Sequence, residues 1–352
     1  MINSGRNIVL ILVGVVMVAA LVGASQGGAA PAKPNPKPAP TATASPLSWA
    51  EVLEQNPDPK VVTDADFLKR ITATKLPWRV KDKASGMEMF LVPPGKFVMG
   101  MSPGDTEAVV REKFLAEKTP EFKYSERPAH EVTISKSFYL GRTEVTQEQW
   151  VKVMGVNPSE FQDGSRESLV AKYIEEGLTK QEAQANATAQ TPNGWKQENH
   201  PVEKVSWYDC QKFCAKTGLK LPTEAQWEYA CRAGVRKPTY GELDQIAWYD
   251  KNSYSTTHPV AQKAPNALGF YDMIGNVCEW TNDWLEGDYY KSCADGVVDP
   301  TGPAQSEHVA RVLRGGGWYY SSDRCRASCR DSFFDPGSQF KSFGCRFART
   351  AD

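Results

Sequence analysis

The first 47 residues constrain this 352-residue chain most, because their composition cannot build a globular core. After Arg6 comes an uncharged apolar run, Ile8–Ala24 (IVLILVGVVMVAALVGA), slightly shorter than the roughly 20 residues of a spanning helix. Such a run after a positive charge is typical of a signal peptide or an N-terminal membrane anchor, which we assign to residues 1–25. We therefore expect an exported protein, periplasmic or extracellular, either anchored or secreted.

Residues 26–47 are rich in Pro, Ala, Lys and Thr and predict an extended Pro/Ala-rich linker. The rest has room for a sizeable core, since 41% of the whole chain is hydrophobic. The net charge of -1 gives no basic field for nucleic acid, and we expect membrane contact only through the N-terminal segment. Ten tryptophans and 27 glycines favour loops held together by aromatic packing.

The folded part divides into two segments by pattern. Residues 48–85 are predicted as a helical preface, with a helix near Ala65–Ile71, and residues 86–352 as the main domain. Within Met87–Met99 we expect two short strands turned at Pro93-Pro94-Gly95. The alternating pattern of His130–Tyr139 predicts one half-buried strand.

Three later helices have clear start signals. Capping boxes predict helices after Thr146 and Thr223, and Ser206 opens another. Asp163–Gln197 reads as a charged helical insertion, and from Trp248 onward short strands alternate with long loops. The expected class is therefore α+β and loop-rich.

Seven segments carry a family resemblance. They are LVPPGKFVMG (91–100), FYLGRTEVTQEQW (138–150), HPVEKVSWYDCQKFC (200–214), LKLPTEAQWEYACRAG (219–234), NALGFYDMIGNVCEW (266–280), RVLRGGGWYY (311–320) and FGCRF (343–347). In this order, and over residues 86–349, they resemble the formylglycine-generating enzyme family, also called sulfatase-modifying factors. The resemblance implies a fold similar to C-type lectins.

For activity, the resemblance implies an oxidase that converts a sulfatase active-site cysteine to formylglycine. Family enzymes hold copper between two cysteine thiolates, five residues apart, after a Gly-Gly-Ser segment, and soft thiolates select Cu(I). In this chain the segment is Gly315–Gly317, with Tyr320 in the position of the first cysteine and no clear counterpart of the second. Cys325, Cys329 and Cys278 are the candidates for a rebuilt thiol pair.

The substrate pocket implied by the resemblance has a changed lining. Arg330 matches a pocket residue, Ser342 stands where an asparagine binds substrate, and Cys278 stands where a tryptophan lines the pocket. Tyr319 and Tyr320 complete the expected pocket.

The resemblance also implies calcium, bound by two side chains and intervening backbone carbonyls. The matching residues are Asp272, Gly275, Val277 and Glu279, and carboxylates and carbonyls are the hard oxygen ligands that calcium prefers. The alternative is that Asp272 and Glu279 only cap and pair locally.

Export permits disulfides among the eight cysteines. By resemblance the expected pairs are Cys214 with Cys345, and Cys231 with either Cys325 or Cys329.

Three hypotheses for function follow. The first is a non-oxidase binding or assembly module for an exported protein, a peptide or a glycan, because the copper-binding cysteine pair is not retained. The second is a formylglycine-generating oxidase that binds copper through an unconventional cysteine pair. The third is a different enzyme on the same scaffold.

Overall fold

The computed structural model describes residues 47–101, 126–162, 166–190, 199–293, 296–306, 309–331 and 334–351. The chain divides into two units, 1–45 and 46–352, and all described residues lie in the second. The expected signal peptide or anchor, Ile8–Ala24 included, lies outside the described residues. Within the described ranges, no helix has the length and apolar character needed to cross a bilayer.

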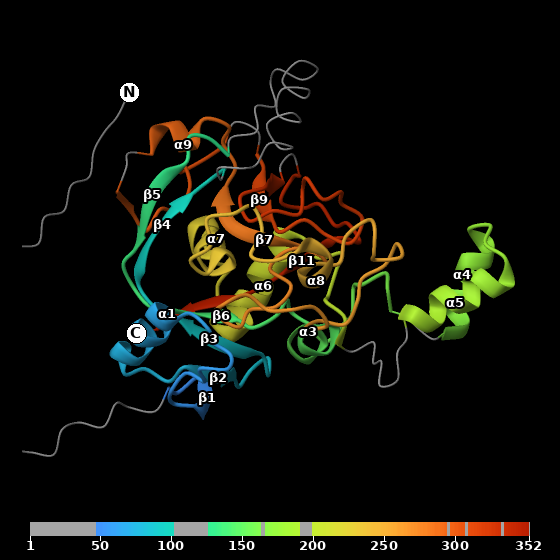
Figure 1. The fold of residues 1–352 in the computed structure, drawn as a ribbon, viewed down its shortest axis with the longest axis horizontal. Helices are drawn as coiled ribbons and strands as arrows, with labels where there is room; N and C mark the ends of the chain where they lie inside the picture. The colour runs from blue at the N-terminus through green and yellow to red at the C-terminus, as the bar shows by residue number, and fades with distance from the viewer. Residues whose placement is uncertain are drawn as a thin grey trace, which may run out of the picture. The chain divides into compact units, whose positions relative to one another are not determined.

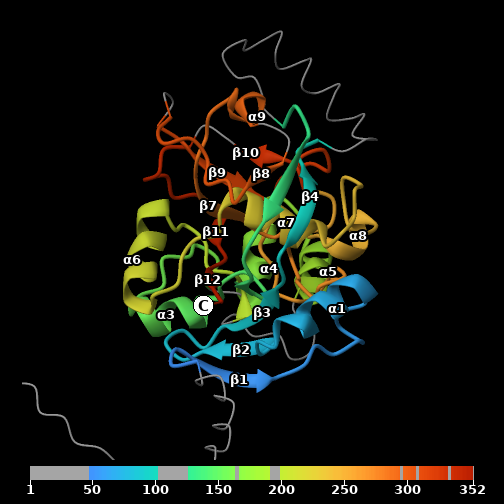
Figure 2. The same ribbon diagram turned by 90° about the vertical axis from the view of Figure 1, so that its left-hand side faces the viewer.

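A five-stranded antiparallel sheet in the order β1-β2-β3-β6-β12 forms one end of the folded unit (Figures 1 and 2). Its strands are β1 (Ala50–Glu54), β2 (Arg79–Asp82), β3 (Glu88–Val92), β6 (Phe138–Gly141) and β12 (Ala348–Thr350). The segment 48–85 was expected to be a helical preface. It holds one helix, but β1 and β2 also extend the sheet of the main domain, because β2 pairs with β3 over three residues.

The second sheet, in the order β10-β9-β7-β11, carries four of the expected site residues, Cys278, Glu279, Arg330 and Cys345. Its strands are β7 (Cys278–Trp284), β9 (Arg311–Arg314), β10 (Arg330–Asp331) and β11 (Phe343–Cys345). β11 runs parallel to β7 and sets Gly344 opposite Glu279. A Cβ on Gly344 would lie 2.6 Å from Val277 Cγ2 and 2.7 Å from the Val202 carbonyl oxygen, so glycine is required there.

A third sheet corrects two expectations about strands. It consists of β4 (Gly95–Met99), β5 (His130–Ile134) and β8 (Val297–Val298). Pro93-Pro94 therefore separates two sheets instead of closing a hairpin between β3 and β4. His130–Tyr139 is likewise two strands, β5 and β6, because Ser135 leaves the ladder and its backbone N–H donates to Asp299 Oδ1 at 2.8 Å.

The longer helices of the main body begin where the sequence predicts, whereas two short helices were not predicted. They are α1 (Ala65–Thr74), α3 (Gln147–Met154), α6 (Trp207–Thr217) and α7 (Glu224–Arg232), with two short helices α8 (Leu243–Ile246) and α9 (Tyr289–Ser292). Both partners of a capping box are present before α3, α6 and α7. Every residue of α7 except Gln226 is buried, and Trp227 and Cys231 both point inward with no exposed surface.

The expected helical insertion is confirmed where it is described. α4 (Arg166–Glu175) and α5 (Lys180–Gln190) form a helical pair with its own small apolar cluster and extend away from the sheets (Figure 1). The Tyr173 hydroxyl donates to the Tyr254 carbonyl at 3.0 Å and links this pair to the main body.

Candidate functional site

A tight glycine turn follows β9 and places the candidate residues. Gly315 and Gly316 have φ values of 96° and 72°, in the left-handed region that favours glycine. A Cβ on Gly316 would lie 2.9 Å from Cys325 Sγ, so the turn packs directly on this thiol. Beyond the turn, the Trp318 N–H donates to the Asn276 carbonyl at 2.7 Å.

An aromatic surface follows the turn, and we define it by Phe161, Trp318, Tyr319, Phe340 and Lys341. Tyr319 is 47% exposed and Phe340 is 49% exposed. Neighbouring rings lie 5.3 Å apart for Trp318 and Tyr319, and 5.5 Å apart for Phe161 and Trp318. The Lys341 ammonium lies 5.5 Å from the Trp318 ring centre, within cation–π range. Exposed aromatic rings beside a cation are a common basis for ligand binding.

The structure brings three of the four expected pocket residues together. Tyr320 is buried against Tyr319 with ring centres 4.2 Å apart, and burial raises the pKa of Tyr319, which hydrogen bonds with Tyr320 and Ser342 partly offset. Arg330 is instead committed elsewhere. Its guanidinium is buried and donates to both carboxylate oxygens of Glu224, at 2.7 and 3.0 Å. Arg330 therefore forms a buried ion pair with the first residue of α7.

The candidate thiols lie beneath this pocket. Cys278, Cys325 and Cys329 are all buried, and burial raises the pKa of each; for Cys329 it reaches about 11. Asp331, Cys325 and Cys329 add to the rise at Cys278. Burial therefore disfavours the free thiolates, and a copper ion bound here would have to displace the thiol protons. Across the described residues no group of three or more His, Cys, Asp or Glu side chains is arranged to hold a metal ion.

None of the expected cysteine pairs is joined in the structure, where all eight cysteines are free thiols, and the pairings stay predictions. Cys214 and Cys345 are not bonded, and the thiol of Cys345 hydrogen-bonds to Cys210. Cys231 is not bonded to Cys325 or Cys329, and its sulfur lies 3.9 Å from the Met273 carbonyl oxygen. On α6, Cys210 therefore faces Cys345 of β11, where we expected Cys214.

The loop expected to bind calcium is built differently at its two ends. Glu279 accepts hydrogen bonds from Arg346 Nη2 at 2.8 Å and from Trp227 Nε1 at 2.7 Å, so both of its carboxylate oxygens already have hydrogen-bond partners. Asp272 accepts one hydrogen bond at Oδ2, from the Ala261 N–H at 2.6 Å. Its Oδ1 is buried and has no hydrogen-bond partner in the described part of the chain. Gly275 and Val277 lie between them, where the sequence placed the carbonyl donors.

A third buried carboxyl, Glu144, adjoins this loop and was missed by sequence reasoning. It accepts hydrogen bonds from the Val277 N–H at 2.9 Å and from Asn276 Nδ2 at 2.8 Å. Burial, then the charges of Asp272 and Glu279, raise the pKa of Glu144 well above its usual value. Arg346 donates to Glu279 and its charge also acts on Glu144 and Asp272, while Lys263 adds a second positive charge near Asp272. The Asp272 oxygen without a hydrogen-bond partner offers one hard ligand for a cation, whereas Glu279 as arranged does not.

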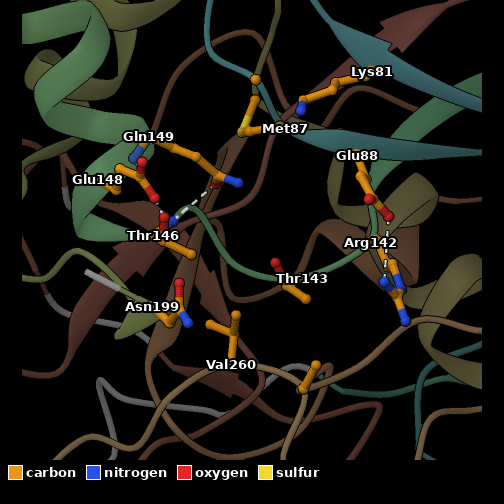
Figure 3. Close-up of a pocket in the computed structure, with 12 residues that line it drawn as sticks. Lys81, Met87, Glu88, Arg142, Thr143, Thr146, Glu148, Gln149, Asn199 and Val260 are labelled. Carbon is orange, nitrogen blue, oxygen red and sulfur yellow. Dashed lines mark hydrogen bonds and ion pairs between the residues drawn. The ribbon is translucent and has the colours of Figure 1, made fainter. Parts of the chain in front are cut away.

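A separate cleft of about 240 Å³ lies between β2, β3 and the start of α3 (Figure 3). Lys81, Glu88 and Arg142 stand on one side, and Glu148 and Gln149 on the other. The remaining lining residues are Gly86, Met87, Thr143, Thr146, Asn199, Val260 and Ala261. Sequence reasoning missed this cleft because its residues come from five segments and share no motif.

The three sheets, the glycine turn and the aromatic surface define the loop-rich α+β class expected above. The chain belongs to the family of the sulfatase-modifying factor enzyme 1-like domain, which matches residues 75–351. The match begins before β2, in agreement with the place of that strand in the sheet.

Three similar proteins illustrate the range of the family. The serine/threonine-protein kinase pkn1 of Chlamydia caviae is 32% identical over 274 residues, covering 77% of this chain and 39% of that protein. The formylglycine-generating enzyme of Streptomyces coelicolor is 35% identical over 174 residues, covering 44% and 54% respectively. The solved structure of Treponema denticola variable protein 1 has a TM-score of 0.56 and 28% identity, covering 75% and 95%. The chain thus spans about two fifths of the kinase-named relative.

Proposed function

We propose that this protein is an exported binding or assembly module of the sulfatase-modifying factor family, and not an oxidase. Tyr320 carries the proposal, because it stands in the position of the first copper cysteine and is buried. The thiols beneath it, Cys278, Cys325 and Cys329, are buried, and burial raises the pKa of each, which disfavours the thiolate form that binds Cu(I). The kinase name of the chlamydial relative supports use of this domain in proteins with other activities.

The aromatic surface is the proposed ligand face. Its exposed rings, Tyr319 and Phe340, offer apolar contact area, and Lys341 offers a charge beside them. The expected ligand is an exported protein, a peptide or a glycan, all of which are bound by aromatic side chains with polar neighbours.

The oxidase reading remains the alternative, and it has one supporting observation. Counted from Tyr320, Cys325 lies five residues on, the separation of the family's two thiolates, although the shorter stretch up to Arg330 leaves the second cysteine without a clear counterpart; the charge of Cys325 also raises the pKa of Cys278, after burial and Asp331. A copper site would then need Cys325 together with Cys278 or Cys329.

Copper(I) binding by the reduced full chain separates these functions. Beside it we would measure a Cys325→Ser/Cys329→Ser variant. We expect no binding above the level of the variant, because the thiols are buried and Tyr320 stands in the position of the first copper cysteine. Tight one-to-one binding that the variant loses would contradict the proposal, and oxidation of a sulfatase peptide would be the next assay.

Peptide and glycan arrays test the ligand face itself. We expect the full chain to bind array members that Tyr319→Ala no longer binds. Val156→Ala is the matched control, because Val156 is 68% exposed and lies outside the aromatic surface. Equal loss in both variants would argue against a site at Tyr319.

A further inference from the structure

The cleft beside α3 holds two charges of opposite sign that have no ion-pair partner among the residues the structure describes. They are Lys81 on β2 and Glu148 in the first turn of α3, and they stand on opposite sides of the cleft (Figure 3). Other surface charges of this protein do form ion pairs; Lys96 Nζ and Glu131 Oε1, for example, lie 2.9 Å apart. An unpaired cation facing an unpaired anion across a cavity is suited to a ligand that carries both charges.

The other charged groups of the cleft strengthen the cationic side. Glu88 Oε2 accepts from Arg79 Nη2 at 2.9 Å and from Arg142 Nη1 at 3.2 Å, so this carboxylate is already shared by two guanidinium groups. Arg142 Nε is buried and has no hydrogen-bond partner in the described structure. The Arg142 guanidinium adds positive charge on the same side of the cleft as Lys81 (Figure 3), and guanidinium and ammonium groups both bind carboxylates.

Neutral polar groups line the space between the two charged sides. Gln149 uses its side-chain oxygen to accept the Thr146 N–H at 3.0 Å, which leaves its amide N–H groups toward the cleft (Figure 3). The Asn199 side chain lies below it in the same view. Amides of this kind can donate to and accept from a peptide group.

The size of the cleft limits the ligand. Its volume of about 240 Å³ is below the roughly 300–1,000 Å³ of sites for drug-sized molecules. We propose that this cleft binds a zwitterion of dipeptide size, with its carboxylate toward Lys81 and Arg142 and its ammonium toward Glu148. The site is distinct from the aromatic surface, with which it shares no residue, and does not depend on the function proposed there.

Isothermal titration calorimetry of the full chain with L-alanyl-L-alanine tests the proposal. We expect binding that weakens at high salt, and no binding of the same dipeptide with its ends blocked as acetyl and amide. Lys81→Gln and Glu148→Gln should each weaken the binding of L-alanyl-L-alanine by about tenfold, as expected for loss of one charge-assisted hydrogen bond. Lys136→Gln is the control, because it removes an exposed positive charge in the turn between β5 and β6, outside the cleft.

Three results would overturn the proposal. The first is no heat of binding up to about 10 mM dipeptide, beyond the millimolar range of weak specific sites. The second is unchanged affinity in both cleft variants, with their melting temperatures showing that they are folded. The third is binding of succinate that is as tight as that of the dipeptide and insensitive to Glu148→Gln, which would mean a simple anion site.

Discussion

Glu203 lies just before α6 with no exposed surface. Its Oε1 accepts the Phe161 N–H at 2.8 Å, and its Oε2 has no hydrogen-bond partner in the described part of the chain. Burial raises the pKa of this carboxyl to about 8. The native state therefore holds Glu203 protonated at neutral pH.

This raised pKa predicts a stability that falls with pH. Below about pH 4.5 the carboxyl is protonated in both states. Between about 4.5 and 8 the unfolded chain has released the proton and the native state has not, so the unfolding free energy decreases as pH rises. The decrease is complete above about pH 8 and amounts to roughly 3–5 kcal/mol.

Urea denaturation between pH 4 and 9 checks this expectation. Glu203→Gln should lack the decrease and should be more stable than the parent above pH 8. Glu160→Gln is the control in the adjacent loop, where the side chain is 49% exposed and pairs at 3.7 Å with Lys204. Its effect should stay below about 1 kcal/mol. Parallel pH curves for the parent and Glu203→Gln would rule out a buried, protonated Glu203.

Residue-scale features could be predicted from sequence where they depend on near neighbours. Trp227 and Cys231, one helical turn apart, face the core as their spacing indicates. The partner of Arg330 could not be predicted, because Glu224 lies more than one hundred residues away and only the packed fold joins them. The contact between Cys345 and Cys210 could not be predicted either, because the rotation of α6 about its axis decides which of its cysteines faces β11.

At the scale of elements, α7 organises the buried charges. Glu224 and Glu228 lie one turn apart on this helix. Glu228 binds Arg232 at 2.8 Å and contacts Arg314, and it accepts the Gly100 N–H at 2.9 Å. Arg314 and Glu228 both have no exposed surface. The helix thus joins β9 to the start of the loop after β4.

Removal of one partner should be costly here, because it leaves a buried guanidinium uncompensated. We expect Glu228→Ala to lower the unfolding free energy by about 3–5 kcal/mol, measured by urea denaturation. Glu131→Ala is the matched control, since it breaks an exposed pair with Lys96. Its effect should be below about 1 kcal/mol. Similar effects for the two variants would mean that the α7 network is hydrated and not buried.

Element starts were predictable and sheet membership was not. The capping boxes at Thr146 and Thr223 are local signals, and both helices begin there. The assignment of β3 and β4 to different sheets depends on contacts with distant strands, and an apolar run flanking Pro93-Pro94 has the same pattern in either arrangement.

At the scale of the folded unit, the Asp272 loop joins parts of the chain that are far apart in sequence. Glu144 precedes α3, Asp272 and Glu279 flank the turn into β7, and Arg346 follows β11. Arg346 Nη1 also donates to the Gly141 carbonyl at 2.9 Å, at the end of β6. This cluster therefore connects the five-stranded sheet to the sheet that carries the glycine turn.

We propose that calcium strengthens this connection, with Asp272 as its side-chain ligand. The Asp272 Oδ1, which has no hydrogen-bond partner in the described structure, supports the proposal. A ligand that binds only the native state at about one hundred times its Kd adds about 2.7 kcal/mol of stability. We expect calcium to raise the melting temperature of the full chain, and EGTA to reverse the rise.

Asp272→Asn separates a bound calcium ion from a purely internal pairing of the carboxyls, because the two readings give shifts of opposite sign. Asparagine keeps an oxygen for the Ala261 N–H but removes the charge that faces Glu144 and Glu279. Without calcium the variant should therefore melt at or above the temperature of the parent, since repulsion is relieved. With calcium in excess it should melt below the parent, since the charged ligand is lost. If the parent does not respond to calcium, or if the variant responds equally, calcium does not bind through Asp272. Arg346 would then be the cation that balances this cluster.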